Sequence, residues 1–184
     1  MPDKVLFVDD NPEILDAYQR TLHKHLPVEI APGFTAALEM IRNSGPYNVV
    51  VIDIPSPTPE GIDFLARMQE ISPDTVQMAL TGYTGLKSVM DALERRNVFR
   101  YLIKPISPDS MVASLNAGLK QYRLQTDARM LRVLIDVMEM ESAGLSRTEA
   151  CATLRGRGGP YDIPIIDAVE MLGVSNMAKS GAKH

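Results

Sequence analysis

Short apolar runs alternate with longer amphipathic stretches over the first two thirds of the chain. Apolar, β-branched runs are typical of strands covered on both faces, and the amphipathic stretches between them are typical of helices. The alternation therefore predicts five βα units around a parallel sheet. The predicted strands are Val5–Val8, Val28–Ala31, Val49–Ile52, Val76–Leu80 and Tyr101–Ile103, and the predicted helices are Pro12–His25, Thr35–Asn43, Gly61–Ile71, Leu86–Arg95 and a long helix from Pro108.

Capping residues and helix breakers support these units. Asn11 followed by Pro12 predicts a helix start, because Asn caps free amides and Pro fits the first turn. The breakers Gly45 and Pro46 predict the end of the second helix. The helical pattern from Pro108 continues to about residue 142, which is longer than a helix that closes a domain needs. We therefore expect an α/β domain at residues 1–122 and a helical tail at residues 123–184.

The tail has signals for two further helices. Ser146 and Glu149 form a capping-box pattern, because the serine can cap the helix while the glutamate reaches back to it. The expected order after this short helix is a loop at Arg155–Pro160, an amphipathic helix at Ile163–Leu172 that ends at Gly173, and a frayed terminus at Met177–His184.

Composition indicates a globular chain. Of 184 residues, 45% are hydrophobic and 23% charged, which provides both a core and a polar surface. The single cysteine, Cys151, cannot form an internal disulfide, and the chain shows neither a signal peptide nor a run long enough to span a membrane. We therefore expect a cytoplasmic protein without a membrane partner. Neither part is basic, since residues 1–122 carry 11 Lys and Arg against 15 Asp and Glu and the tail carries eight of each, so we expect no nucleic-acid partner.

Chemically reactive side chains follow the predicted strands. Ligand sites of open parallel sheets lie beyond the carboxyl ends of the strands. Carboxylates brought to that edge repel each other, by about 4 kcal/mol for a pair at 4 Å in an effective dielectric near 20, so they need cations. A lysine and a hard divalent ion such as magnesium can supply them, which makes phosphoryl transfer plausible. The residues concerned are Asp9 and Asp10 after the first strand, Asp53 after the third, Thr81 after the fourth and Lys104 after the fifth.

Each of these positions also has an ordinary structural explanation. The pair Asp9-Asp10 can cap a helix, Asp53 can stand in a turn, Thr81-Gly82 is a common turn and Lys104 can be a solvated lysine before a helix. Unrelated turns rarely put acids, a hydroxyl and a lysine after successive strands, so the whole set favours a site.

The motifs resemble the receiver domain of bacterial two-component response regulators over about residues 3–122. The resemblance implies a flavodoxin-like (βα)5 fold with a five-stranded parallel sheet, to which the tail adds a C-terminal α-helical extension. The stretches that carry it are Val5-Leu6-Phe7-Val8-Asp9-Asp10-Asn11-Pro12, Val51-Ile52-Asp53 with Pro57 and Gly61 at the family spacing, Leu80-Thr81-Gly82, and Tyr101-Leu102-Ile103-Lys104-Pro105.

The resemblance also implies a role for each matching residue. Asp53 is expected to accept a phosphoryl group from a sensor histidine kinase or phosphotransfer protein, with Mg²⁺ as cofactor. Thr81 and Lys104 are expected to contact that group, and Tyr101 to hold the aromatic switch position. The implied metal ligands are Asp9, Asp10, Asp53 and the backbone carbonyl of Pro55. No enzymatic activity is expected beyond Mg²⁺-dependent self-phosphorylation and self-dephosphorylation.

One loop departs from the family pattern. Prolines alternate at positions 55, 57 and 59, where the family usually has only the proline at Pro57. Pro55 keeps the carbonyl that the metal needs and loses its N–H, so metal binding should survive. The lifetime of the phosphoryl group is the property that this loop puts in doubt.

The tail carries an alternative hypothesis. Its segments Ala128–Asp136, Gly144–Ala150 and Gly159–Pro164 are faintly similar to the closing part of HD-GYP cyclic-dinucleotide phosphodiesterases. The chain would then be the regulatory receiver of a degenerate, inactive phosphodiesterase, because it has only three histidines and no Gly-Tyr-Pro. His23 and His25 lie two residues apart and are expected to be a solvated pair.

The remaining candidates are assigned to structure. Met130, Met138, Met140 and Met171 are expected to line apolar helix faces and Cys151 to be a buried helix residue. We expect a response regulator that signals through protein–protein interaction. Its kinase, pathway, downstream protein and oligomeric state, including a homodimer, stay open, and a transcription factor is the least supported class.

Overall fold

The computed structural model of the protein describes residues 3–56, 58–82, 87, 90–91, 97–157 and 163–180, with side chains described as far as residue 171. The chain divides into two compact units, Met1–Arg123 and Leu124–His184. The predicted helix at Leu86–Arg95 and the family proline Pro57 lie outside the described residues, apart from positions 87, 90 and 91 of that helix.

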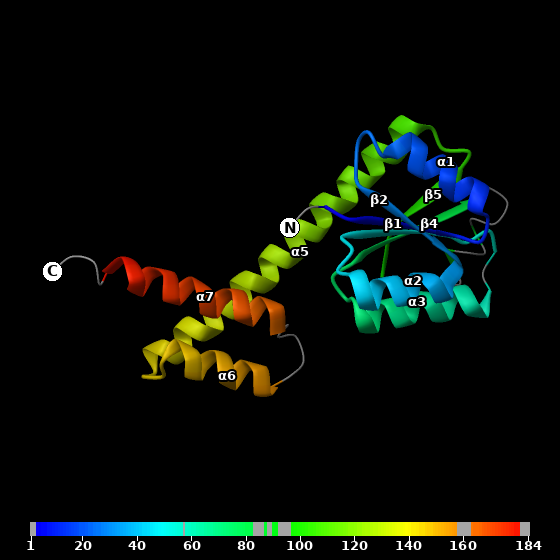
Figure 1. Cartoon of the computed structure of the whole chain (residues 1–184). Helices are drawn as coiled ribbons and strands as arrows, with labels where there is room; N and C mark the ends of the chain where they lie inside the picture. The colour runs from blue at the N-terminus through cyan, green and yellow to red at the C-terminus, as the bar shows by residue number, and fades with distance from the viewer. Residues whose placement is uncertain are drawn as a thin grey trace. The chain divides into compact units, whose positions relative to one another are not determined.

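The first unit is built on a parallel sheet of five strands in the order β2-β1-β3-β4-β5 (Figure 1). Every neighbouring pair is parallel, and β1 lies between β2 and β3. This is the flavodoxin-like strand order, so the predicted fold class is confirmed. The strands are β1 (Val5–Asp9), β2 (Val28–Pro32), β3 (Val49–Asp53), β4 (Val76–Gly82) and β5 (Val98–Lys104).

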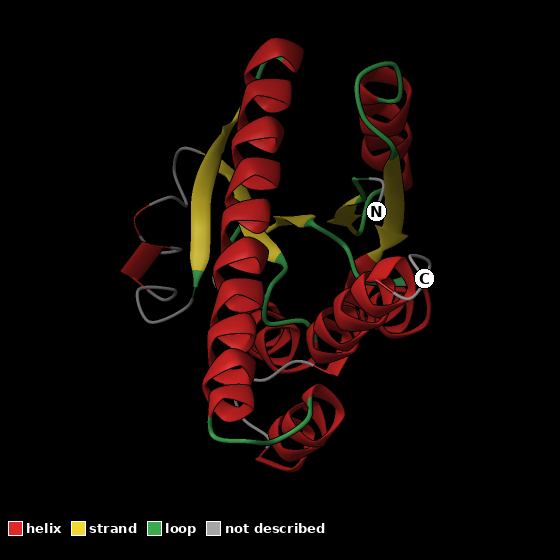
Figure 2. Cartoon of the chain, turned by 90° about the vertical axis from the view of Figure 1, so that its left-hand side faces the viewer, coloured by secondary structure: helices red, strands yellow, loops and turns green. Residues whose placement is uncertain are grey.

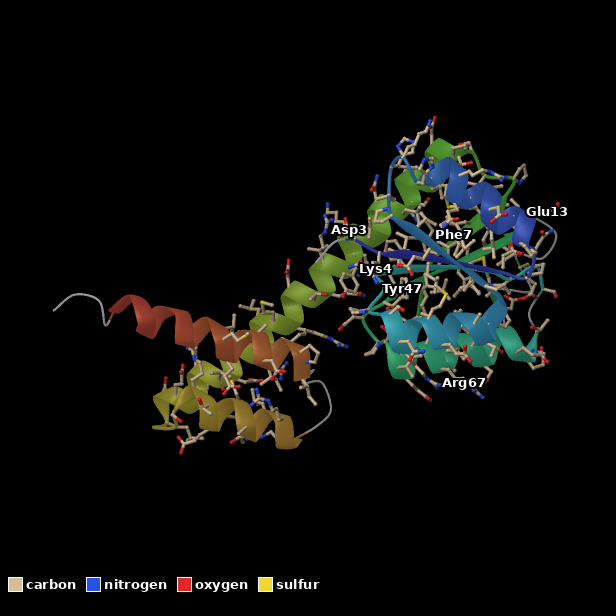
Figure 3. The ribbon with its side chains drawn as sticks, in the orientation of Figure 1. Asp3, Lys4, Phe7, Glu13, Tyr47 and Arg67 are labelled. Atoms are coloured by element: carbon tan, nitrogen blue, oxygen red, sulfur yellow. The ribbon has the colours of Figure 1, made fainter. Side chains whose placement is uncertain are left out.

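Helices cover both faces of the sheet because successive strand residues point to opposite sides. Phe7 packs with Leu15 in the core that joins the sheet to α1 (Pro12–Leu22) and to the first part of α5 (Pro108–Ser142). Leu6 packs with Phe64 in the core under α2 (Gly33–Ser44) and α3 (Pro59–Ile71). Figure 1 shows these helices above and below the sheet, and Figure 3 labels Phe7 in the upper layer.

Capping side chains set the starts of two helices, of which the start at Asn11 and Pro12 was predicted. The Asn11 side chain accepts a hydrogen bond from the Glu13 amide at 2.9 Å, and Pro12 begins α1. Thr58 caps α3 in the same way, accepting from the Gly61 amide at 3.2 Å. These caps satisfy amides that a helix leaves free at its start.

Several predicted boundaries in the first unit were wrong. Helix α2 begins at Gly33, two residues before the predicted Thr35, and strand β4 ends at Gly82, two residues after the predicted Leu80. Helix α1 ends at Leu22 instead of His25, where the residues before Pro27 leave the helix. Helix α3 begins at Pro59, two residues before the predicted Gly61, because Thr58 provides its cap. Strand β5 begins at Val98, three residues earlier than predicted, because an edge strand tolerates exposed residues that break the apolar pattern.

The second unit has its own apolar core between the last part of α5, α6 (Arg147–Arg157) and α7 (Ile163–Ser180). Figure 2 shows α5 as one unbroken helix. Ser146 and Glu149 form the predicted capping box, since the Ser146 amide donates to Glu149 at 2.8 Å and the Glu149 amide donates to the serine hydroxyl at 3.3 Å. The buried residues of this core are Val133, Val137, Ala150, Cys151, Leu154, Ile165, Ile166 and Val169.

Ion pairs join the helices of this unit. Arg147 makes two hydrogen bonds to Glu141, at 2.8 and 3.0 Å. Arg155 pairs with Asp167 at 2.6 Å and with Glu170, and so connects α6 to α7. The predicted loop at Arg155–Pro160 is therefore wrong at its start, because residues 155–157 belong to α6.

Two further tail predictions need correction. Helix α7 does not end at Gly173 but continues to Ser180, since a glycine inside a helix costs only about 1 kcal/mol relative to alanine. Met130 and Met140 do pack against the tail core, whereas Met138 and Met171 are exposed.

Cys151 is buried as predicted, and burial raises the pKa of its thiol. None of the described helices has the length and hydropathy that a membrane crossing requires.

We expect Leu115→Ala to lower the free energy of unfolding by about 2 to 5 kcal/mol, because a fully buried leucine leaves a cavity when it is truncated. Urea denaturation followed by circular dichroism measures this change. Lys120→Ala on the exposed side of the same helix is the matched control and should change the free energy by less than about 0.5 kcal/mol. Equal effects of the two variants would contradict the described position of α5 on the sheet.

Candidate functional site

The strand order brings the predicted site residues to one edge of the sheet. Asp9 and Asp53 end the adjacent strands β1 and β3, Thr81 lies near the end of β4, and Lys104 ends β5. Figure 3 labels Glu13, at the start of α1, close to this edge, and Asp3 and Lys4 at the other end of β1. The carboxyl ends of the strands are where open α/β sheets bind ligands.

The Lys104 ammonium lies between two carboxylates. Its Nζ atom is 2.8 Å from Asp53 Oδ1 and 3.8 Å from Asp9 Oδ2. The shorter contact is a close ion pair. Lys104 therefore offsets the repulsion between the two acids through charge, and its ammonium can still turn toward another acceptor.

The surroundings of Asp53 disfavour the charged form of its carboxyl group. Burial raises the pKa of its carboxyl above the ordinary 3.8, Lys104 partly offsets that rise, and Asp9 adds to it. Its side chain is 15% exposed, against 7% for Asp9. A partly accessible carboxylate with a raised pKa beside a lysine is a candidate for chemistry rather than for structural support.

The acidic residues line a cavity of about 320 Å³. Asp10 is exposed at its rim, and its Oδ1 atom would lie 2.8 Å from a Cβ at Gly33. Gly33 has a φ of +86°, a conformation that favours glycine. Both this backbone conformation and the nearby Asp10 oxygen therefore disfavour a side chain at position 33. The cavity is lined by Val8, Asp9, Asp10, Asn11, Ile14, Gly33, Phe34, Asp53 and Pro55.

The site fits a hard divalent cation. Asp9 Oδ2 is a buried oxygen without a hydrogen-bond partner among the described residues, which is the condition of an unused ligand atom, and Asp53 Oδ1 is held by its ion pair with Lys104. Within the same residues no three His, Cys, Asp or Glu side chains converge closely enough to hold a metal alone. Magnesium suits such a site, because it takes one or two carboxylates and completes its shell with waters, carbonyls and phosphate oxygens.

Thr81 and Tyr101 differ in how they are held. Thr81 is fully buried, and its hydroxyl donates a long hydrogen bond, of 3.5 Å, to the Gly82 carbonyl. A bond of that length holds the hydroxyl weakly. Tyr101 is partly buried against the core under α2 and α3, and burial raises the pKa of its phenol.

Sequence reasoning missed two cavity residues, Gly33 and Phe34. They enter the site from the start of α2, and Phe34 stacks on Phe64 at a ring distance of 4.9 Å. The signal for Gly33 was the Pro-Gly pair that follows the second strand, which is typical of a turn with positive φ. No signal in the sequence distinguished Phe34 from an ordinary core residue.

The family is shown by comparison with known proteins. The family model of the response regulator receiver domain matches residues 5–116, which is more than half of the chain. The chain therefore belongs to the response regulator receiver domain family. It contains a receiver domain of the two-component signalling type.

Individual relatives agree with this assignment. The hydrogenase transcriptional regulatory protein HoxA of Bradyrhizobium diazoefficiens is 28% identical over 123 residues, which are 67% of this chain and 25% of HoxA. A CheY-like receiver domain protein from Methanospirillum hungatei is 25% identical, with a TM-score of 0.60, over 68% of this chain and 99% of that one. The structure of an adenylate cyclase from Rhodopirellula baltica is 34% identical, with a TM-score of 0.65, over 71% of this chain and 97% of that one.

The chain spans about a quarter of the length of HoxA. The activities in these names belong to those proteins. The comparisons give no support to the predicted relation between the tail and HD-GYP phosphodiesterases. His23 and His25 are both exposed, as a solvated pair requires, and the His23 ring contacts the Arg20 carbonyl at 2.7 Å.

We expect Asp53→Asn to be more stable than the parent protein at pH 7 when no divalent cation is present. Because the pKa of Asp53 is raised on folding, its contribution favours the folded state below pH 3.8 and is lost as the pH rises through the raised value. The uncharged asparagine avoids that loss. The stability difference should shrink as the pH falls toward 4.

Urea denaturation in EDTA at several pH values measures this difference. The control variant is Asp63→Asn, which removes an exposed carboxylate paired with Arg67 on α3 and should give no gain at pH 7. A parent protein that is more stable than Asp53→Asn at pH 7 would mean that Lys104 outweighs the burial of Asp53.

Proposed function

We propose that this chain is a phosphorylation-controlled response regulator that accepts a phosphoryl group on Asp53 from a sensor histidine kinase or phosphotransfer protein. The observation that carries the proposal is the Asp53 carboxylate at the cavity, 2.8 Å from the Lys104 ammonium and beside the acid Asp9. The proposal includes a cytoplasmic location, where the buried thiol of Cys151 stays reduced.

The reaction needs little more than positioning and charge. An Asp53 oxygen attacks the phosphorus atom, the bond from phosphorus to the donor breaks, and the donor keeps that electron pair. Lys104 pairs with the phosphoryl oxygens, because phosphoryl transfer is assisted mainly by electrostatic stabilisation. Mg²⁺, when bound, would neutralise phosphoryl charge, and its ligands would be Asp9, Asp10, Asp53 and the Pro55 carbonyl.

The response would pass through Thr81 and Tyr101. The Thr81 hydroxyl, whose hydrogen bond to the Gly82 carbonyl is long at 3.5 Å, is able to turn toward a phosphoryl oxygen. That movement makes space for the Tyr101 ring on the neighbouring strand, where Ala79 of β4 pairs with Tyr101 of β5. A coupled change of two side chains gives two discrete states, which a downstream protein can distinguish.

The tail at residues 123–184 is proposed as an output or interaction segment that acts on a downstream protein. Its own buried core supports a folded module. HoxA is named as a transcriptional regulator, whereas this tail has no excess of basic residues, so the proposed partner is a protein. A salt-dependent DNA mobility shift by the purified chain would overturn that choice of partner.

We expect acetyl phosphate with magnesium to modify the protein at Asp53, because its carboxylate lies beside both the lysine and the metal ligands. Mass spectrometry of the intact protein and of its peptides locates the acyl phosphate. Asp53→Asn should abolish the modification, and the control Asp63→Asn, on the exposed face of α3, should leave it unchanged. Acyl phosphate on another residue, or a phosphorylated Asp53→Asn variant, would disprove the acceptor assignment.

We expect Tyr101→Ala to leave Asp53 modifiable while it weakens the response to modification, since the tyrosine is part of the switch and not of the reaction. Hydrogen exchange of residues 86–140, with and without beryllofluoride and magnesium, measures the response. The parent protein should change its protection in this region and Tyr101→Ala should change it less. Identical protection of the parent protein in both states would refute the switch.

A further inference from the structure

Helix α5 is apolar on two opposed faces beyond residue 123. One face is covered within the second unit, where Val133 and Val137 are fully buried against α6 and α7. Met130 and Met140 pack at the edge of the same core. Figure 1 shows α6 and α7 beside this part of α5. The opposite face has no such cover among the described residues.

The uncovered face, here the α5 stripe, consists of Leu124, Ala128, Leu131, Ile135 and Met138. Four of these are large apolar side chains with exposed fractions of 55%, 58%, 45% and 59% for Leu124, Leu131, Ile135 and Met138. The spacing along the stripe is four, three, four and three residues, which is the heptad repeat of a coiled coil. An apolar stripe of this kind on a soluble chain marks an interaction surface.

We propose that the α5 stripe is the interface of a parallel, in-register coiled coil between two copies of this chain. In that arrangement each stripe residue meets the same residue of the second copy. Leucines alternate with an Ile135 layer and a small Ala128 layer, and leucine with β-branched isoleucine in these positions favours two strands. The interface does not depend on phosphorylation of Asp53, so it goes beyond the function proposed above.

Charge complementarity selects the second copy and its direction. Asp127 and Arg132 are exposed on either side of the stripe and lie five residues apart. In a parallel coiled coil, residues with this spacing pair across the interface, so Asp127 meets Arg132 of the second copy, and symmetry repeats the pair. Arg132 also contacts Asp136 of its own helix at a long 3.7 Å, a contact loose enough to be shared.

An antiparallel pair has the opposite electrostatics. In an antiparallel coiled coil, the residues on one flank of the stripe pair with residues on the same flank of the second copy. When Leu131 packs against Ile135 of the second copy, Asp127 therefore comes opposite Glu141 of the second copy. Arg132 then comes opposite Arg132 of the second copy. The contact between the two arginines joins like charges, which destabilise such a pair, and the contact of Asp127 with Glu141, whose carboxylate already pairs with Arg147, provides no attraction in return. The charges beside the stripe therefore favour the parallel direction.

The stripe is short enough to give a reversible dimer. From residue 124 to residue 142 a helix rises about 28 Å, which is about two and a half heptads. Isolated coiled coils of that length are weak, so the dimer of the full chain is expected to dissociate on dilution in the micromolar range.

Sedimentation velocity of the full-length chain over a wide concentration range tests the proposal. The parent protein and Asp53→Asn should both dimerise. Leu131→Glu combined with Ile135→Glu should give a monomer, while Met171→Glu, which changes an equally exposed apolar residue outside the stripe, should still dimerise. Circular dichroism and thermal unfolding check that each variant is folded, which is expected because all three residues are exposed.

Charge reversal tests the direction. Asp127→Arg and Arg132→Asp should each raise the dimer dissociation constant by about fivefold to tenfold, the size expected for two exposed ion pairs lost. The double variant should restore the parent value. A monomeric parent at every concentration, or a dimer insensitive to the glutamate substitutions, would overturn the interface. Failure of the double variant to restore dimerisation would overturn the parallel register.

Discussion

The ion pair between Lys104 and Asp53 is the interaction on which the rest of the first unit depends. Asp9 and Asp53 end neighbouring strands, so the sheet that holds them also forces two carboxylates together. The Lys104 ammonium at 2.8 Å from one and 3.8 Å from the other makes that arrangement tolerable. Strand β5 therefore contributes to the site through the charge of its last residue as well as through its place in the sheet.

The same pair links stability to chemistry. Burial raises the pKa of Asp53 even with Lys104 beside it, so the lysine compensates only part of the cost of the negative charge in this cluster. A cation or a rearranged lysine relieves that charge, and the proposed phosphoryl transfer to Asp53 would use both. The buried Asp9 Oδ2 atom, which has no hydrogen-bond partner among the described residues, is the structural sign of this remaining negative charge.

The sequence was sufficient for the strand runs and for the edge at which Asp9, Asp53, Thr81 and Lys104 meet, because apolar runs and strand ends are local signals. The sequence was insufficient where the exposure of a residue depends on which other elements pack against it. The start of β5 was missed because Phe99 and Arg100 of an edge strand are exposed. Gly33 and Phe34 were missed because their approach to the cavity comes from the β2–α2 connection and not from a recognisable motif.

The tail shows the same limit. Methionines at helical spacing predicted apolar helix faces, yet Met138 is exposed while Met130 and Met140 pack against the core. A helix with two opposed apolar faces has the pattern of a buried helix, and only the structure distinguishes the face covered by α6 and α7 from the stripe that runs from Leu124 to Met138. Composition alone cannot make that distinction, because both faces use the same residue types.

We infer that Lys104 pairs with the charged Asp53 carboxylate until a phosphoryl group replaces that carboxylate as its partner. A crystal structure of the chain with magnesium and beryllofluoride tests this exchange. We expect beryllofluoride on an Asp53 oxygen, the Lys104 ammonium turned to a fluorine atom, and magnesium on Asp9, Asp10, Asp53 and the Pro55 carbonyl. Beryllofluoride bound elsewhere, or bound to Asp53 with Lys104 still on the aspartate oxygen and no metal on these ligands, would contradict it.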